Sequence, residues 1–350
     1  MHTPLMHCSP PRSPNRHVGT SSTSRLSPPV SRLLSPFSTA RYSMRSVLQR
    51  AARQPLMQSR RQLGSSTYET LSLTQPAPRI VQVELSQPGK SNSMTRKFFP
   101  ELDRCFRAIS TDSSCRVVIL TGAGKNFCSG LDLQDHAQLL GLAPGEGESK
   151  GGKAELGRQA LKTMDFVARL QDSFATLRQC RKPVIAAVSG ACIGGAMDLI
   201  MGADIRLCSK DAFFSVKEVD IGMAADLGTL QYLSKVMGND SLAREMVYTA
   251  RAVPAQEAKE AGLVSGLYPA REELQQAALA MASVIASKSP VAVQGSKVNM
   301  NYAQEHSAQV SVNRRGCHSA NLASPSISSH LSPPPAGRHG ISGSLERHHA

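Results

Sequence analysis

Two short runs of branched apolar residues, each followed directly by a glycine-containing turn, constrain this chain most. Residues 116–120 (RVVIL) lead into Thr121–Gly124, and residues 183–188 (PVIAAV) lead into Ser189-Gly190. Runs of this length and composition are typical of strands buried on both faces, as in a parallel sheet that helices cover. The chain is therefore expected to build α/β layers around these two strands.

The remaining periodic segments alternate between strand and helix and become mostly helical toward the C-terminal end. This order predicts an α/β fold with a helical C-terminal region. Further strands are expected at 79–85, 205–208 and 212–216, and helices at 94–109, 156–178, 195–202, 229–237, 241–249, 255–261 and 272–287.

The formal net charge of +14 lies mainly outside the central part of the chain. Residues 1–68 hold ten arginines, no lysine and no acid, and residues 311–350 add a small positive excess. Residues 69–310 are almost balanced, so no nucleic-acid partner is expected. No stretch approaches the roughly 18–20 apolar residues of a membrane span, so none is expected.

Composition also predicts three regions. Residues 1–68 are Arg-rich, Ser-rich and acid-free, as in a mitochondrial transit peptide, with a simple disordered leader or a start at Met44 as alternatives. Residues 69–310 are expected to form the folded domain. Residues 311–350 are dominated by Ser, Pro, His and Gly and predict a disordered tail. The leader favours the mitochondrial matrix, with the peroxisome as the alternative.

The two glycine turns can direct backbone N–H groups at a ligand. They lie within residues 125–133 and 189–198, and a helix starting at Gly194-Gly195 would expose unpaired N–H groups. Two such groups from separate loops can form an oxyanion hole. Glycine-rich turns between a strand and a helix are also common without any ligand, so a purely structural role would explain the same pattern. The spacings of phosphate loops and of dinucleotide-binding turns are absent, so nucleotide binding is not expected.

Three acids near the second turn are candidates for proton transfer. Asp198 and Asp226 stand among apolar residues, where desolvation would raise a carboxyl pKa into a useful range, and Glu218 lies between them in sequence. Structural alternatives remain open: Asp198 could complement a helix dipole, Asp226 could cap the helix near Thr229, and Glu218 could pair with Lys217. Asp204 and Asp220 are interpreted as structural acids, and the eight cysteines, without a C-x-x-C pair, as reduced structural thiols.

The motifs resemble those of the crotonase superfamily. Phe127–Leu133 matches its F-x-x-G-x-D-[LI] pattern, and Lys182–Val188 followed by Cys192–Gly195 resembles its second motif. Ala258–Leu263 and Lys288-Ser289-Pro290 resemble later landmarks. The resemblance covers roughly residues 70–310 and implies a crotonase (ClpP-like) spiral of β-β-α units with a helical C-terminal region, here truncated or replaced by the atypical tail.

Within that superfamily, Val216–Leu230 is similar to the Δ3,5-Δ2,4-dienoyl-CoA isomerases, in which the acids matching Asp198, Glu218 and Asp226 are catalytic. The resemblance implies that Asp226 takes a proton from C2, that Glu218 supplies one at C6, and that Asp198 tunes the pocket. It further implies an oxyanion hole from the N–H groups of Leu131 and Gly195. The residues implied for coenzyme A and substrate binding are Ser129, Gly130, Leu131, Asp132, Leu133 and Gly195.

The resemblance also implies isomerisation of 3,5-dienoyl-CoA to 2,4-dienoyl-CoA in fatty acid β-oxidation. The partners would be an acyl-CoA substrate and other copies of the chain, in a trimer or hexamer that the altered C-terminus puts in question. No metal and no cofactor are expected, because coenzyme A is part of the substrate. An enoyl-CoA hydratase, with Glu at both of the first two acid positions, and a catalytically silent binding protein are the alternatives.

Overall fold

The computed structural model describes residues 59–60, 67–137 and 153–313. The chain divides into two units, Met1–Ser43 and Met44–Ala350, and the first lies wholly outside the described residues. Most of the predicted leader and the predicted tail beyond residue 313 also lie outside them. Within the leader, Ser59–Arg60 forms a short edge strand.

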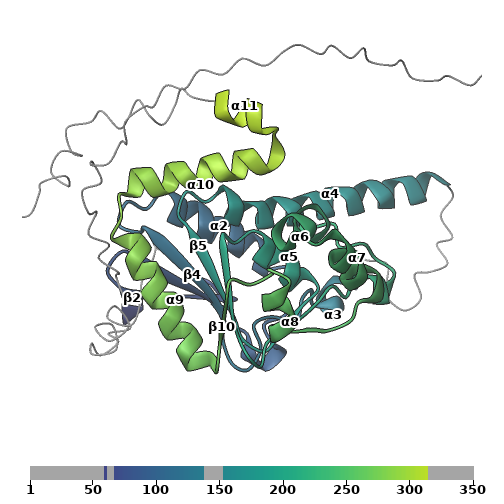
Figure 1. Cartoon of the computed structure of the whole chain (residues 1–350). Helices are drawn as coiled ribbons and strands as arrows, with labels where there is room; N and C mark the ends of the chain where they lie inside the picture. The colour runs from purple at the N-terminus through teal and green to yellow at the C-terminus, as the bar shows by residue number, and fades with distance from the viewer. Residues whose placement is uncertain (1–58, 61–66, 138–152, 314–350) are drawn as a thin grey trace, which may run out of the picture. The chain divides into compact units, whose positions relative to one another are not determined.

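A mostly parallel sheet of seven strands organises the described part (Figure 1). The two apolar runs at 116–120 and 183–188 form its adjacent central strands β4 and β5, which pair in parallel. Next to the edge strand β1, β2 and β3 form an antiparallel hairpin, of which only β3 was predicted. In order across the sheet the strands are β1 (Ser59–Arg60), β2 (Leu71–Ala77), β3 (Ile80–Leu85), β4 (Val117–Gly122), β5 (Val184–Val188), β7 (Ile205–Ser209) and β10 (Gly266–Tyr268).

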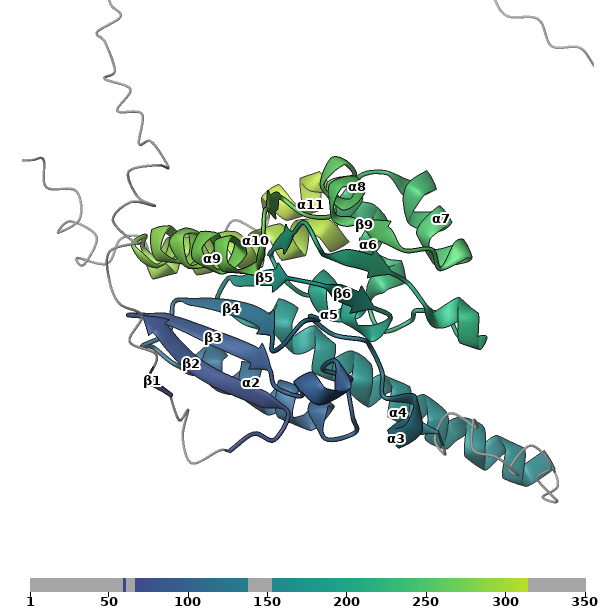
Figure 2. The ribbon, with the colours of Figure 1, turned by 90° about the horizontal axis from the view of Figure 1, so that it is seen from below.

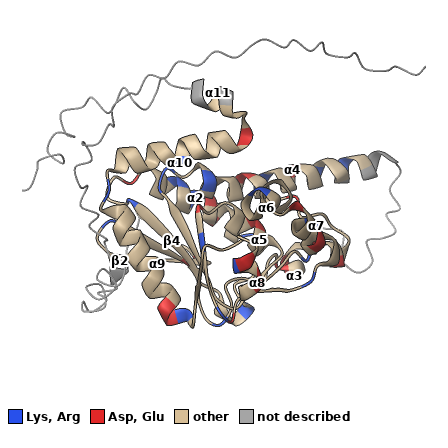
Figure 3. Ribbon diagram, in the orientation of Figure 1, with Lys and Arg blue, Asp and Glu red and all other residues tan. Residues whose placement is uncertain are grey.

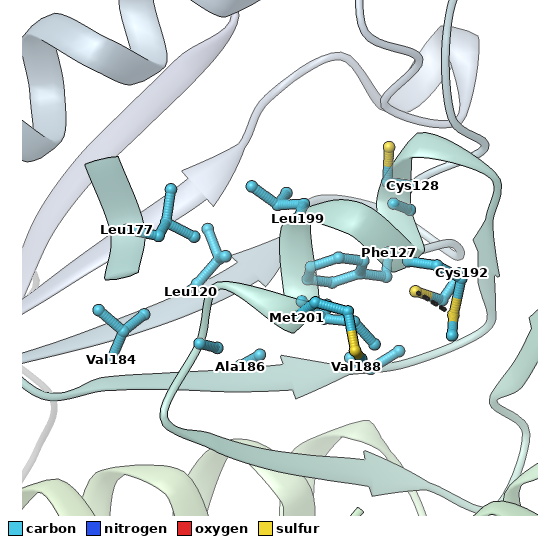
Figure 4. Packing of buried hydrophobic residues seen from close by; sticks show 14 of the residues in the cluster. Leu120, Phe127, Cys128, Leu177, Val184, Ala186, Val188, Cys192, Leu199 and Met201 are labelled. Atoms are coloured by element: carbon cyan, nitrogen blue, oxygen red, sulfur yellow. Dashed lines mark hydrogen bonds between the residues drawn. The ribbon is translucent and has the colours of Figure 1, made fainter. Parts of the chain in front are cut away.

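Successive residues of the central strands point to opposite faces, and each face is covered by helices. Val117 and Ile119 of β4 face helix α9 (Arg271–Ala286), whereas Val118 and Leu120 face the other side. That side carries α2 (Phe98–Thr111), α4 (Lys153–Gln179) and α5 (Gly195–Met201), as Figure 2 shows. In Figure 4, Leu120 and the apolar side chains of β5 pack against residues of α4 and α5. Burial on both faces explains why these strands read as unbroken apolar runs.

Short strands and helices beside the main sheet carry the loops of the site. The three-stranded sheet orders β6 (Ala191–Ile193), β8 (Phe213–Ser215) and β9 (Val253–Pro254). The predicted helices near 229, 241 and 255 are confirmed. The remaining elements are η1 (Pro88–Lys90), α3 (Leu133–His136), η2 (Glu218–Ile221), α6 (Thr229–Met237), α7 (Asp240–Thr249), α8 (Ala255–Glu260), α10 (Pro290–Glu305) and α11 (Ala308–Asn313).

Two details differ from the sequence-based expectation. Helix α2 begins at Phe98 rather than Met94, because Met94 forms a β-bridge with Leu131 instead of joining the helix. Helix α10 was not predicted, although its start carries a local signal: the Ser289 side chain accepts from the Ala292 N–H, and Pro290 occupies the first turn. The predicted α/β fold with a helical C-terminal region is confirmed.

Charge and hydropathy also agree with the central region expected from sequence. Figure 3 shows Lys and Arg interspersed with Asp and Glu over the ribbon. By length and composition, none of the described helices could cross a membrane alone, although the bent pair α9 and α10 passes such a test jointly.

Candidate active site

Both glycine turns and all three candidate acids meet at one cavity of about 400 Å³, here called the main cavity. Its backbone wall comes from the turn after β4 and from the β6–α5 turn, and its acidic wall comes from η2 and the loop before α6. Helix α4 contributes an apolar side. The lining residues are Ser129, Gly130, Leu131, Leu133, Phe166, Val167, Leu170, Ile193, Gly194, Gly195, Asp198, Lys217, Glu218, Asp220, Ile221, Met223, Ala224, Ala225, Asp226 and Leu227.

Backbone hydrogen bonds join the two glycine turns directly. The Cys128 N–H donates to the Ala191 carbonyl at 2.9 Å, and the Ile193 N–H donates to the Cys128 carbonyl at 3.1 Å. The Met94 N–H donates to the Gly130 carbonyl at 2.8 Å from the other side. Residues far apart in sequence therefore hold the two turns in one fixed arrangement.

The N–H groups of Leu131 and Gly195 are free to bind a ligand oxygen. Neither donates to another group in the described part of the chain. The two lie close together, since a Cβ built on Gly195 would stand 3.8 Å from the Leu131 nitrogen. Gly130 makes this approach possible: its φ is +87°, and a Cβ there would lie 2.6 Å from the Ile193 carbonyl oxygen.

Asp198 is buried in the first turn of α5, with 2% of its surface exposed. Its Oδ1 accepts a hydrogen bond of 2.7 Å from the Thr229 N–H, at the start of α6. Its Oδ2 is buried without a partner among the described residues. Desolvation, with a smaller contribution from the Asp226 charge, raises the pKa of Asp198 to about 6.

Glu218 is partly buried at the start of η2. A Cβ built on Gly194 would stand 3.3 Å from its Oε1, so this carboxyl lies against the β6–α5 turn. Desolvation first, and then the Asp198 charge, raise the pKa of Glu218 to about 7. The alternative that Glu218 pairs with Lys217 is wrong, because the Lys217 ammonium binds Asp220 at 2.7 Å.

Asp226 differs from the other two acids. It lines the same cavity but is exposed to solvent, so the desolvation expected from its apolar neighbours in sequence is wrong. The alternative role as a helix cap is also wrong. Gly228 occupies the N-cap of α6 without a side-chain hydrogen bond, and Asp198 accepts from the first N–H of that helix. The acid that accepts from the first N–H of α6 is therefore distant from that helix in sequence.

The predicted coenzyme A loop lies at the cavity, with one exception. Ser129, Gly130, Leu131 and Leu133 are among the lining residues, whereas Asp132 is not. The Asp132 carboxylate caps α3 and forms an ion pair with the Lys90 ammonium at 3.3 Å. Sequence reasoning missed the apolar side made by Phe166, Val167 and Leu170, which the helical spacing of α4 could have indicated.

Other predicted features play structural parts. Asp204 accepts from the Val184 N–H and pairs with the buried Lys297 at 2.8 Å. The six cysteines in the described part of the chain are buried, and no disulfide joins any two of them. Within the described ranges, no group of three or more His, Cys, Asp or Glu residues could hold a metal ion.

Comparisons with known proteins agree with this arrangement. A family model described as enoyl-CoA hydratase/isomerase matches residues 77–324. The mitochondrial Delta(3,5)-Delta(2,4)-dienoyl-CoA isomerase of Rattus norvegicus is 47% identical over 251 residues, covering 72% of this chain and 74% of its own. The peroxisomal enzyme of that name from Arabidopsis thaliana is 38% identical over 245 residues, covering 69% and 85%.

Solved structures give the same family. An enoyl-CoA hydratase from Bacillus anthracis aligns with a TM-score of 0.60 at 28% identity, covering 70% of this chain and 87% of its own. A monofunctional enoyl CoA isomerase from M. smegmatis aligns with a TM-score of 0.55 at 27% identity, covering 69% and 97%. The family model covers more than half of the chain, and the fold and the sequence relatives agree with it. This chain therefore belongs to the enoyl-CoA hydratase/isomerase family.

Proposed function

We propose that this chain is a Δ3,5-Δ2,4-dienoyl-CoA isomerase, which converts 3,5-dienoyl-CoA to 2,4-dienoyl-CoA in fatty acid β-oxidation. One observation carries the proposal: three carboxyl groups and two free backbone N–H groups surround a single, largely apolar cavity. Relatives that are 43–47% identical carry this activity in their names. The roles of the individual site residues are part of the same proposal.

The reaction moves one proton off the substrate and another onto it. Asp226 takes a proton from C2, and the electron pair of that C–H bond spreads over a dienolate that reaches the thioester oxygen and C6. Glu218 then donates its proton to C6, which leaves the conjugated 2,4-diene. A pKa near 7 keeps a large fraction of Glu218 protonated at neutral pH, as a proton donor requires.

The negative charge on the thioester oxygen is stabilised by the N–H groups of Leu131 and Gly195. A preorganised donor of this kind contributes about 3–4 kcal/mol in comparable sites. The loop from Ser129 to Leu133 binds the coenzyme A part of the substrate. No metal or further cofactor takes part, since carboxyl groups and backbone N–H groups supply the chemistry.

Location and assembly complete the proposal. The relatives from Rattus norvegicus and Homo sapiens are named mitochondrial, and an Arabidopsis thaliana relative is named peroxisomal. We place this chain in the mitochondrial matrix, as a trimer or hexamer. A fluorescent reporter fused to residues 44–68 tests the location, and its retention in the cytosol would contradict it. Light scattering of the purified chain tests the assembly.

The activity is tested by following conjugated-diene absorbance after adding 3,5-dienoyl-CoA to the full chain. Asp226→Asn and Glu218→Gln should each lower the rate by about 10²–10⁴, the usual contribution of a positioned acid or base. Asp220→Asn is the matched control, because Asp220 is an exposed acid on the rim of the same cavity and should change the rate less than about threefold.

Two outcomes would contradict the proposal. A parent chain that leaves 3,5-dienoyl-CoA unchanged but hydrates 2-enoyl-CoA would be a hydratase, and one that does neither but binds acyl-CoA would be a silent binding protein. Rates for both acid variants within about threefold of the parent would remove these residues from the mechanism.

A further inference from the structure

The segment that carries Asp226 borders two cavities. Residues 222–228 connect η2 to α6 without regular secondary structure. The segment lines the main cavity and also a second cavity of about 300 Å³. Asp226 and Leu227 line both cavities. Ala225 belongs to the buried core and Leu227 packs against it, whereas Asp226 between them is exposed, so packing fixes the neighbours of Asp226 rather than its own side chain.

Hydrogen bonds within the segment are almost entirely local. The Met223 N–H donates to the Glu218 carbonyl, the Asp226 N–H donates to the Ala224 carbonyl, and the Leu230 N–H donates to the Ala225 carbonyl. All these partners belong to residues 218–232. Local bonds shape the loop but do not tie it to the rest of the fold.

One side-chain hydrogen bond from the described part of the chain reaches the segment from a distant element. The Gln171 Nε2 donates a hydrogen bond of 2.9 Å to the Asp226 carbonyl oxygen, across 55 residues of sequence. Gln171 belongs to α4, and its neighbours Leu170 and Phe174 are each only 4% exposed. The amide therefore extends from a helix fixed in the core to the loop that carries the proposed base.

We propose that Gln171 is a positioning residue for Asp226. The inference rests on the proposed function, in which the Asp226 carboxylate must reach the C2 proton. Gln171 binds the backbone carbonyl of Asp226 and leaves its carboxylate free to accept a proton. A misplacement of about 1 Å at a reacting group can cost about 10²-fold in rate, so a hydrogen bond that fixes the Asp226 backbone from another element matters.

The second cavity supplies a matched control. Gln231 also lines it, is also exposed, and makes no side-chain hydrogen bond with any described residue. Gln171→Met removes the donor and keeps an unbranched side chain of similar length. We expect kcat to fall roughly tenfold with KM within about twofold, and Gln231→Met to leave both within about twofold. Melting temperatures should stay close, because both positions are exposed.

A double-mutant cycle separates positioning from a general structural role. In the Asp226→Asn background the base is already lost, so Gln171→Met should lower the residual rate by less than about twofold. A full tenfold loss in that background, or a single variant Gln171→Met that matches Gln231→Met, would overturn the inference. If instead the parent is inactive or Asp226→Asn keeps the parent rate, the proposed function itself fails, and this inference fails with it.

Discussion

The backbone wall of the main cavity, residues 128–131 and 191–195, is held by strand-like hydrogen bonds, whereas the acid wall, residues 218–228, is held by side chains. On the backbone wall, Cys128 and Cys192 form a β-bridge between the two turns, and both are fully buried. On the acid wall of the described structure, Gln171 bonds to the Asp226 carbonyl, Asp198 accepts from the Thr229 N–H just beyond the wall, and Ala225 and Leu227 pack against the core.

This difference predicts that the two walls respond differently to amino-acid substitutions. No substitution except one by proline removes a backbone N–H group, so other substitutions should impair the backbone wall only by disturbing its geometry. The acid wall should respond in smaller steps, because each carboxyl group and each tether acts through its own side chain. The predictions below test this contrast.

The largest effect is expected from Gly130→Ala on the backbone wall. The φ of +87° is unfavourable for alanine, and the new Cβ would stand 2.6 Å from the Ile193 carbonyl oxygen. Relief of that clash would separate the two turns and misplace the Leu131 and Gly195 N–H groups. We expect a loss of about 3 kcal/mol in unfolding free energy and at least about 100-fold in kcat, measured by denaturant titration and by the diene assay.

Gly222→Ala is the matched substitution on the acid wall. Its φ of +74° is similar, but no heavy atom lies within 4 Å of the added Cβ. Only the backbone cost of about 1–2 kcal/mol remains. If Gly130→Ala and Gly222→Ala destabilised the protein equally, strain alone would explain both results and the contrast between the walls would be lost.

The central fold could be predicted from sequence because its signals are strong and local. Residues 117–120 and 184–188 are apolar throughout, and both faces of β4 and β5 are indeed buried. The helix at 229–237 was predicted with the observed bounds. By contrast, β6 and β9 have three and two residues, which is too short for a periodic pattern, and they form only because neighbouring strands pair with them.

The candidate site shows the same limit. Sequence could place Asp198, Glu218 and Asp226 near one another through motifs, and the structure brings them to one cavity. Their environments could not be read from their neighbours in sequence. Asp226 stands between apolar residues yet is exposed, whereas Asp198, in the first turn of α5, is buried and accepts a hydrogen bond from the start of α6. No pattern in the sequence around Gln171 or Asp226 indicates the hydrogen bond between them.

The next effect concerns the tether made by Asp198. Asp198→Ala leaves the buried Thr229 N–H without its acceptor, whereas Asp198→Asn keeps an oxygen in that place. An unsatisfied buried N–H costs about 1–3 kcal/mol. We expect the alanine variant to be less stable than the asparagine variant by about 2 kcal/mol in urea unfolding at pH 5. Equal stabilities would show that the bond does not hold the acid wall.

Stability should also depend on pH through the same group. The folded-state pKa of Asp198 is raised to about 6, so the folded protein binds this proton more tightly than the unfolded chain does. The associated stabilisation is complete below about pH 4 and is lost as the pH rises through 6. Asp198→Asn removes this dependence. The difference in unfolding free energy between variant and parent should therefore change by on the order of 2 kcal/mol in favour of the variant from pH 4 to pH 8.

The smallest effect, and the most specific to the acid wall, is a displacement of the pH–rate profile. Glu218 must be protonated to donate a proton to C6, so kcat/KM should fall as the pH rises through about 7. The negative charge of Asp198 contributes to that raised pKa. Asp198→Asn removes the charge and keeps the Thr229 bond, so the alkaline limb should move to lower pH by roughly half a unit to one unit.

Asp220→Asn serves as the control, because Asp220 is an exposed acid paired with Lys217 and is not among the charges that raise the Glu218 pKa. A limb that stays in place in Asp198→Asn, or moves equally in Asp220→Asn, would show that Glu218 does not set it.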